Sequence, residues 1–165
     1  MKTYDEDSAI TNEVSEIGIL ISKPVSEVWK QYQDLSSWVT SHEIEEVSNE
    51  KRQVGAIFRV TFKQAGAMGY PPPHHHYCKI IKMVAERQYV LKTYSEEGGS
   101  YGMRISAFDD ARFHLEGSGT RVTFAYFGEH KVMRPKEVPV QFDMKVSDEG
   151  MLANLKNLKK ILENS

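Results

Sequence analysis

The last stretch of the chain constrains the fold more than any other feature of the sequence. From Ser147 to Leu162, apolar residues recur at the three- and four-residue spacing of an α-helix, with lysines on the opposite side. Ser147 is a good N-cap, and Asp148 and Glu149 would lie in the first turn, where the helix dipole favours negative charge. Such an amphipathic helix needs apolar surface to cover. Its apolar stripe consists of Met151, Leu152, Leu155, Leu158, Ile161 and Leu162.

Most of the remaining chain is typical of β-strands. A first strand is predicted at Glu13–Ser22, followed by a helix that Pro24 opens and a short helix at Leu35–Thr40. Apolar and polar residues then alternate, as in strands with one buried face. The further strands are predicted at 44–47, 58–63, 77–85, 88–95, 101–116 with an interruption at Asp109–Asp110, and 120–127, with a loop at 64–76 and turns at 51–55, 86–87, 97–100 and 117–119.

This order of elements predicts an α+β helix-grip architecture. A curved antiparallel sheet of about seven strands would wrap around the long C-terminal helix, and two short helices after the first strand would plug one end. The first strand would pair back with the last one. We expect residues 1–12 to form a flexible tail and residues 13–165 to form a single domain.

Composition excludes several classes of function. The chain has 165 residues, a formal net charge of −2 and no apolar run near the roughly 20 residues that span a bilayer. No strong attraction to nucleic acid or anionic membrane is implied. The N-terminus does not resemble a secretory signal, and a single cysteine, Cys78, fits a reducing cytoplasm. We therefore expect a cytoplasmic monomer or homodimer without nucleic-acid partners or integral membrane association.

Three short motifs, in this order, carry a resemblance to a known superfamily. They are Lys23-Pro-Val-Ser-Glu-Val-Trp29, Gly119-Thr-Arg-Val-Thr-Phe124, and Glu149-Gly-Met151 followed by Asn154-Leu155. The chain resembles the START-like (SRPBCC) helix-grip superfamily from Val14 to Leu162, most of all its bacterial polyketide cyclase/dehydratase and lipid-transport branch. The resemblance implies an elongated cavity between sheet and helix for hydrophobic or aromatic small molecules. Because the superfamily also includes toxins and co-chaperones, it leaves the function open.

The histidine run offers two kinds of chemistry. If a strand begins at His74, then His74, His76 and Cys78 share one face and are weak candidates for a zinc site. No fourth ligand is evident, solvated histidines on a stiff loop are the alternative, and we expect neither a metal nor another cofactor. The second possibility is general acid–base chemistry at the cavity mouth, for which His76 and Tyr77 are the catalytic candidates.

Strand side chains that point inward would line the cavity. Tyr126 is the best tyrosine candidate because it shares a face with Val122 and Phe124, and a phenol can hydrogen-bond a ligand while its ring packs on apolar surface. The predicted ligand-binding residues are Phe58, Val60, Phe62, Tyr89, Met103, Phe124, Tyr126, Met151 and Leu155.

The register of one predicted strand decides between a carrier and an enzyme, because it determines whether an acid–base pair is buried. His114 and Glu116 alternate with Phe113 and Leu115, so they face solvent if the phenylalanine is buried. In the reverse register they would form a buried acid–base pair. Arg59 and Arg104 are likewise expected to point outward, although an inward arginine would suit a ligand carboxylate.

Three functions remain in competition. The preferred one is a binding protein for a polyketide- or lipid-like molecule. The second is a metal-independent enzyme of the cyclase/dehydratase kind, and the third is a protein-interaction module like the co-chaperones. No phosphate-binding loop, dinucleotide fingerprint or nucleophile elbow occurs, so phosphoryl transfer, nicotinamide redox chemistry and serine hydrolysis are not expected.

Overall fold

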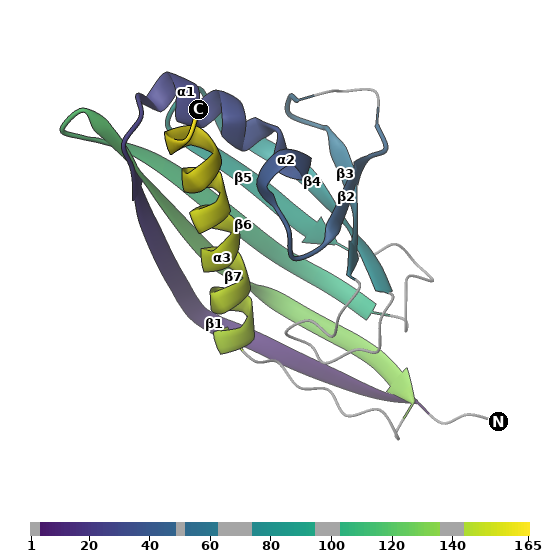
Figure 1. Cartoon of the computed structure of the whole chain (residues 1–165). Coiled ribbons are helices and arrows are strands. Elements are labelled where there is room, and N and C mark those ends of the chain that lie inside the picture. The colour runs from purple at the N-terminus through teal and green to yellow at the C-terminus, as the bar shows by residue number, and fades with distance from the viewer. Residues whose placement is uncertain (1–3, 49–51, 63–73, 95–102, 136–143) are drawn as a thin grey trace.

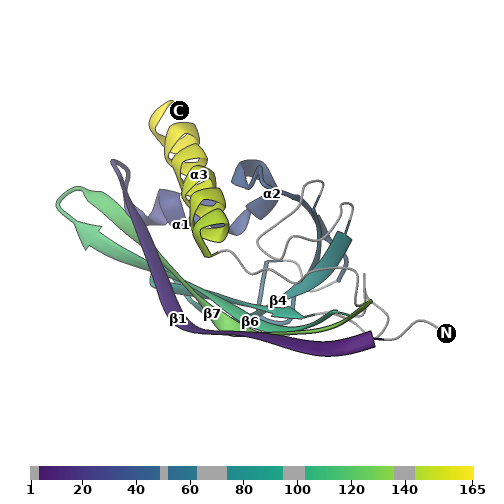
Figure 2. The same cartoon turned by 90° about the horizontal axis from the view of Figure 1, so that it is seen from below.

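A computed structural model describes residues 4–48, 52–62, 74–94, 103–135 and 144–165, and these residues form a curved antiparallel sheet that holds one long helix. Figure 1 shows the arrangement, and Figure 2 shows that the helix lies on one side of the curved sheet. The sheet has seven strands in the order β1 (Tyr4–Ile21), β7 (Gly119–Pro135), β6 (Met103–Glu116), β5 (Gln88–Tyr94), β4 (His74–Val84), β3 (Ile57–Phe62) and β2 (Glu43–Glu46). The helices are α1 (Val25–Gln33), α2 (Leu35–Trp38) and α3 (Met144–Glu163). The helix-grip prediction is confirmed.

Strand β1 pairs with β7, as predicted, and so joins the start of the chain to its last strand. Ile17 lies opposite Phe124 in this ladder. The pairing also runs back to Tyr4, opposite Pro135, with a register shift between Thr11 and Ser15. Residues 4–12, which we expected to form a flexible tail, are therefore part of a strand, because the length of β7 offers them backbone partners. The division into a tail and a single domain otherwise stays a prediction.

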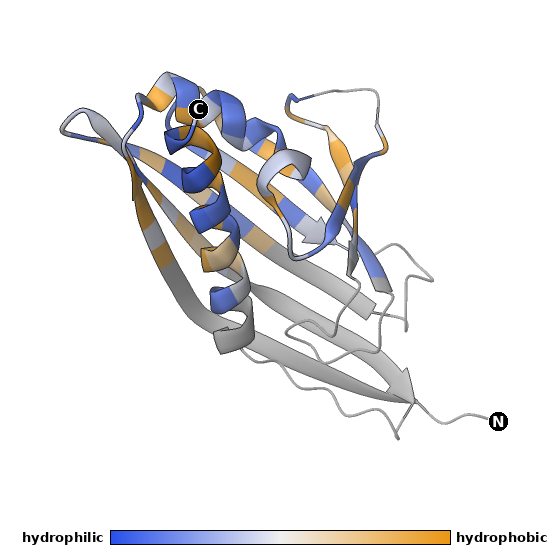
Figure 3. Cartoon of the chain, viewed as in Figure 1, coloured by the Kyte–Doolittle hydropathy of each residue, from blue (hydrophilic) through white to orange (hydrophobic). Residues whose placement is uncertain are grey.

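The hydrophobic core lies between α3 and the face of the sheet that packs against it, which we call the inner face. From α3, Leu155, Leu158 and Leu162 are buried, and Met151 and Ile161 pack against the same cluster. These are the residues of the predicted apolar stripe, and Figure 3 shows hydrophilic residues along the exposed side of the helix. The strands contribute Ile21, Phe58, Val60, Cys78, Ile80, Tyr89, Leu91, Ala111, Phe113, Val122 and Phe124.

Several predicted boundaries are wrong, including the end of β7, which was predicted at 127 and lies at Pro135. Helix α3 begins at Met144, so Ser147 lies inside it, and no acidic residue lies in its first turn. Strand β6 continues through Asp109 and Asp110, where we expected an interruption. Aspartate has a low preference for strands, but here β5 and β7 supply ladder partners on both sides, and this tertiary pairing outweighs the local preference.

The turns and short strands follow the sequence closely. The predicted turn at 86–87 is present with Glu86 at a φ of 61°, and the turn before β7 contains Gly117 at a φ of 62°. Strand β4 begins at His74, inside the predicted loop 64–76. The predicted turn at 97–100 lies outside the described residues.

Asn154 of α3 anchors the segment that connects α2 to β2. Its Oδ1 accepts hydrogen bonds from the backbone N–H groups of Thr40 (2.9 Å) and Ser41 (3.3 Å) and from the hydroxyl of Thr40 (3.2 Å). Its Nδ2 donates to Ser41 Oγ at 2.9 Å. Because Asn154 is almost fully buried, these bonds fix the position of that segment against the helix.

Candidate functional site

Polar side chains interrupt the apolar inner face near the middle of the sheet. Asp109 on β6 lies opposite Tyr126 on β7 and Leu91 on β5, and Cys78 on β4 lies opposite Thr93. On the edge strand β2, Glu46 lies opposite Phe58. Since strand side chains alternate between faces, these groups share the face that α3 covers. We call the following set the interior polar residues: Glu46, Cys78, Tyr89, Thr93, Asp109 and Tyr126.

Three of these residues carry an atom that is buried without a hydrogen-bond partner in the part of the chain that the structure describes. The atoms are Glu46 Oε1, Tyr89 OH and Asp109 Oδ1. A buried polar group left unpaired costs about 1–3 kcal/mol. Such groups are rare in native proteins, and each one calls for a partner such as a water molecule or a ligand.

Burial sets the protonation state of these groups. It raises the pKa of the Asp109 carboxyl to about 7, so this acid exchanges its proton near neutral pH. Burial is also the main reason that the pKa values of Tyr89 and Tyr126 lie above the usual value of a phenol. The carboxyl of Asp109 raises the pKa of Tyr126 further. Both phenols are therefore neutral at physiological pH.

The Cys78 thiol belongs to the same electrostatic environment. Burial, with a contribution from Asp109, raises its pKa to about 12, while the hydrogen bond with Thr93 acts in the opposite direction. The Sγ and Thr93 Oγ1 atoms are 3.4 Å apart. Because the thiolate is the reactive form, Cys78 is not a nucleophile in this state.

The predicted ligand-binding residues fall into three groups. Buried in the core are Phe58, Val60, Tyr89, Phe124 and Leu155. Tyr126 and Met151 are partly buried against the same core. The side chains of Phe62 and Met103 lie outside the described part of the chain. Their role in binding stays a prediction.

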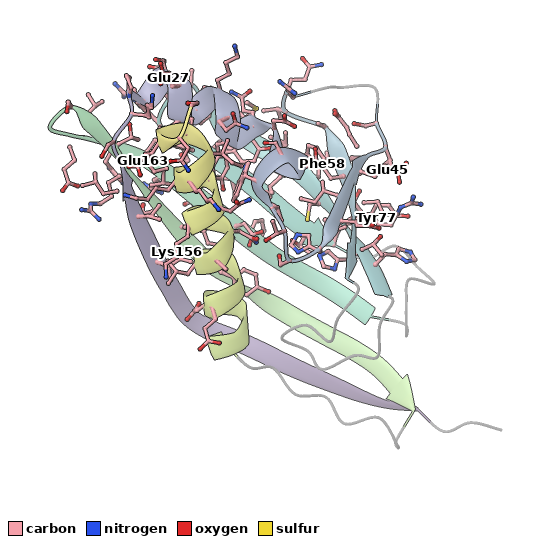
Figure 4. The ribbon with its side chains drawn as sticks, in the orientation of Figure 1. Glu27, Glu45, Phe58, Tyr77, Lys156 and Glu163 are labelled. Carbon is pink, nitrogen blue, oxygen red and sulfur yellow. The ribbon has the colours of Figure 1, made fainter. Side chains whose placement is uncertain are left out.

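The two catalytic candidates lie on opposite faces of β4. His76 pairs with Val60 on the inner face and is half-buried. Tyr77 pairs with Arg59 on the outer face, stacks on Tyr94 with ring centroids 5.9 Å apart, and meets His75 edge-on at 6.0 Å. Figure 4 labels Tyr77 and Phe58 on these neighbouring strands. Strand alternation turns Tyr77 away from the inner face, and its catalytic role stays a prediction.

The candidate metal ligands do not form a site in the described structure. His76 and Cys78 share the inner face, but the side chain of His74 lies outside the described residues. Among the residues that are described, no three His, Cys, Asp or Glu side chains gather closely enough to hold a metal ion.

The register of β6 resolves the acid–base alternative. Phe113 is buried, while His114 and Glu116 are exposed. Glu116 pairs with Arg121 at the surface, where Arg121 Nη2 lies 3.0 Å from Glu116 Oε1. The buried pair of His114 and Glu116 is therefore excluded. Arg59 is also exposed and pairs with Glu45, and the side chain of Arg104 is not described.

Two open hollows lie away from the interior polar residues. One, of about 820 Å³, lies beside the hairpin ends and includes Arg87, Arg112 and Leu115. The other, of about 500 Å³, lies between α2 and β2 and includes His42, whose pKa is lowered to about 4 by burial. Neither contains a predicted ligand-binding or catalytic residue.

The acidic members of the interior polar residues were missed from the sequence. Asp109–Asp110 looked like a strand interruption, and Glu46 was one of two adjacent glutamates in a short strand. One signal was available: period two places Asp109 on the same face as Ala111 and Phe113. Extending the strand through the aspartates would have placed a carboxyl in the core.

The curved seven-stranded sheet around α3 defines a protein with a helix-grip fold. No protein-family model matches the sequence, and no curated protein matches it. The fold itself is shared with solved structures, which show the same sheet closing on a C-terminal helix.

Three of these structures are informative. Ara h 8.0201 has a TM-score of 0.62 and 12% identity, over 93% of this chain and 99% of that chain. A point mutant of a Thalictrum norcoclaurine synthase, in complex with a transition-state analogue, has a TM-score of 0.61 and 16% identity, over 99% and 98%. DynU16, described as a putative protein in the dynemicin biosynthetic locus, has a TM-score of 0.59 and 14% identity, over 93% of this chain and 48% of that chain. At this level of identity the likeness establishes the fold alone.

A search of the described helices for a membrane span found none long and apolar enough to cross a bilayer.

Proposed function

We propose that this protein binds a hydrophobic or aromatic small molecule, polyketide- or lipid-like, between the inner face of the sheet and α3. The observation that carries the proposal is the presence of unpaired, buried polar atoms, Tyr89 OH and Asp109 Oδ1, on an otherwise apolar face. Ligand sites combine apolar walls with a few polar groups that fix orientation. The location that we propose is the cytoplasm, which suits the single free thiol of Cys78.

The energetics favour an occupant that is mostly apolar. Burying ligand surface against Phe58, Phe124 and Leu155 would contribute about 25 cal/mol per Å² before the costs of association. Hydrogen bonds to Tyr89 and Asp109 would relieve the unpaired groups and orient the ligand. The fold neighbours lend support, since one was solved with a transition-state analogue and another comes from a biosynthetic locus.

Binding can be tested with the neutral, environment-sensitive naphthalene dye Prodan. We expect its emission to shift to the blue and its binding to saturate. The Met151→Trp variant would place an indole against the core and should weaken binding about tenfold or more, because it fills the proposed space. Ala153→Trp, on the exposed side of the same helix, is the matched control and should bind normally. Circular dichroism shows whether each variant is folded. Absence of dye binding by the folded wild-type protein would overturn the proposal.

An enzymatic function of the cyclase/dehydratase kind is a second candidate, favoured by the pKa of Asp109. A carboxyl that exchanges its proton near pH 7 is suited to general acid–base catalysis, and Tyr126 lies directly opposite it in the ladder. His76 remains a candidate proton donor on the same face. The enzyme would accelerate exchange of the α-protons of 1-phenyl-1,3-butanedione in D₂O, measured by NMR, and Asp109→Asn should abolish the acceleration. If the wild-type protein exchanges no faster than buffer of equal carboxylate concentration, the carrier function stands alone.

A further inference from the structure

The inner face has acidic groups but no described lysine or arginine, and the one basic side chain described on the strands of this face is the half-buried His76. Glu46 and Asp109 bring two carboxyls to the inner face. Among the described residues, the fully buried polar side chains are Thr93, Thr120 and Asn154, so no described lysine or arginine is fully buried. The ion pairs recorded for the described lysines and arginines use other carboxylates, including Asp34, Glu45, Asp110, Glu116 and Glu163.

The lack of a compensating cation is costly for Asp109 in particular. Its Oδ1 is sealed from solvent and has no hydrogen-bond partner. A buried carboxylate is stable only when it is paired or hydrogen-bonded; otherwise it takes up a proton. The described residues therefore supply no positively charged donor to Asp109 Oδ1.

A second unpaired polar atom lies on the same inner face. Tyr89 is 1% exposed, and its hydroxyl also lacks a partner. Its ring is held by edge contacts with Trp29 at 6.3 Å and Tyr32 at 5.3 Å. The ring is thus fixed while its polar end is free to accept a hydrogen bond from an occupant.

From these observations we infer that the ligand carries a basic nitrogen, and that its protonated amine binds Asp109, with Tyr89 as a further acceptor on the same face. This inference rests on the proposed function and names the class of molecule that the same site takes. The amine supplies the N–H donors and the charge that the described interior lacks, while the apolar body of the ligand packs on Phe58, Phe124 and Leu155. A desolvated ammonium–carboxylate pair with additional hydrogen bonds is a strong interaction.

The same charges select against acidic ligands. A carboxylate brought near Asp109 and Glu46 would meet like charge in a medium of low dielectric constant, which weakens binding. Specificity often depends on such repulsion as much as on attraction. The protein should therefore discriminate against free fatty acids and prefer an apolar or aromatic amine.

Three dansyl probes of similar size separate the possibilities. Dansylcadaverine has a free amine, its N-acetylated form is neutral, and dansyl-6-aminohexanoate has a carboxylate. At pH 8 we expect the amine to bind about tenfold more tightly than the acetylated probe, equivalent to about 1.4 kcal/mol, and the carboxylate to bind most weakly. Fluorescence titration gives each dissociation constant.

Two neighbouring aspartates provide the matched variants. Asp109→Asn keeps the shape of the side chain and removes its charge, so it should reduce the preference for the amine to less than about twofold while the acetylated probe still binds. Asp110→Asn should leave the preference unchanged, because Asp110 pairs with Arg112 and accepts from Gln88 at 3.1 Å.

The preference should also decrease as the pH falls from 8 to 5, when Asp109 becomes protonated. Of the titratable groups on the same face, Cys78, Tyr89 and Tyr126 stay protonated throughout, because burial raises their pKa values. Glu46 and His76 share this face, and the pH profile of Asp109→Asn separates their contribution from that of Asp109. Equal binding of all three probes at pH 8, or an unchanged preference in Asp109→Asn, would overturn the inference and leave the proposed function standing. Failure of all three probes to bind the folded protein would instead overturn the proposed function.

Discussion

The closed end of the sheet, under α1, and the middle of the sheet differ in how completely their side chains are satisfied. At the closed end, Phe113 meets Trp29 and Tyr32 edge-on with centroid distances of 5.1 Å. Trp38 Nε1 donates to the carbonyl oxygen of Tyr32 at 3.0 Å, so even the polar atom of this large residue is paired. In the middle of the sheet, Asp109 buries an unpaired oxygen, and Glu46 does the same on the edge strand β2.

Tyr89 connects the two regions. Its ring belongs to the aromatic packing of the closed end, and its hydroxyl belongs to the interior polar residues. The comparison indicates that the two regions have different roles. The closed end contributes stability, whereas the middle of the sheet is less stable than it could be because its polar groups serve a function. Local violations of packing rules tend to occur at functional sites.

The largest expected effect comes from removing an aromatic ring at the closed end. Phe113→Ala should lower the free energy of unfolding by about 3–5 kcal/mol, because it removes buried surface and leaves a cavity. Leu115→Ala, two residues along the same strand and 77% exposed, should change it by less than about 0.5 kcal/mol. Urea denaturation followed by circular dichroism measures both. Similar losses for the two variants would mean that the closed end is not the stabilising region.

The second prediction is a gain in the free energy of unfolding, from a substitution in the middle of the sheet. The native state holds the proton of Asp109 more tightly than the unfolded chain does, since its pKa is raised from 3.8 to about 7. Stability is therefore lost as the pH rises from about 4 to about 7, by up to about 4 kcal/mol at 1.36 kcal/mol per pKa unit. Asp109→Asn, which cannot ionise, should recover most of this loss at pH 8 and have little effect at pH 4.

Urea titrations at the two pH values test this prediction, with Asp110→Asn as the control for the loss of a neighbouring charge. The prediction would be contradicted if the Asp109→Asn variant were less stable than the wild type at pH 8. That result would mean that the carboxylate is already well paired, and the contrast between the two regions would disappear.

The fold could be predicted from the sequence because it depends on repeated patterns. The stripe from Met151 to Leu162 indicated an amphipathic helix, and alternation in residues such as Phe58, Val60 and Phe62 indicated half-buried strands. Each pattern is redundant, so one atypical residue changes little. The start of α3 was missed because Met144 and Lys145 precede the apparent cap at Ser147, and helix ends depend on few residues.

The candidate site was harder to predict, because it consists of exceptions to the pattern. Asp109 interrupts an apolar face, and only the pairing of β6 with two neighbours shows that the strand continues through it. The face of Tyr77 was hard to predict because a shift of one residue along a strand changes the face. The contact between Asn154 and Thr40 joins residues 114 apart in sequence, which no local pattern indicates.

A third, smaller loss of stability is expected from removing a buried polar side chain whose polar atoms are all hydrogen-bonded. Asn154→Ala should destabilise the protein by about 2–3 kcal/mol, because the backbone N–H groups of Thr40 and Ser41 lose their acceptor. Asn157→Ala, on the same helix, loses one hydrogen bond to the Trp38 carbonyl oxygen and should cost about 1 kcal/mol. If both variants are equally stable in urea, the segment between α2 and β2 is held by other contacts.

The smallest expected effect concerns Cys78, in the middle of the sheet. Cys78→Ala removes one small buried atom and a weak hydrogen bond with Thr93, so it should cost only about 1 kcal/mol in urea denaturation. The wild-type thiol should react with a disulfide reagent much more slowly in the folded than in the unfolded protein, since burial raises its pKa to about 12 and keeps it protonated. Equally fast labelling in both states would show that solvent reaches the interior polar residues. Water would then satisfy Glu46, Tyr89 and Asp109, and the middle of the sheet would no longer require a ligand.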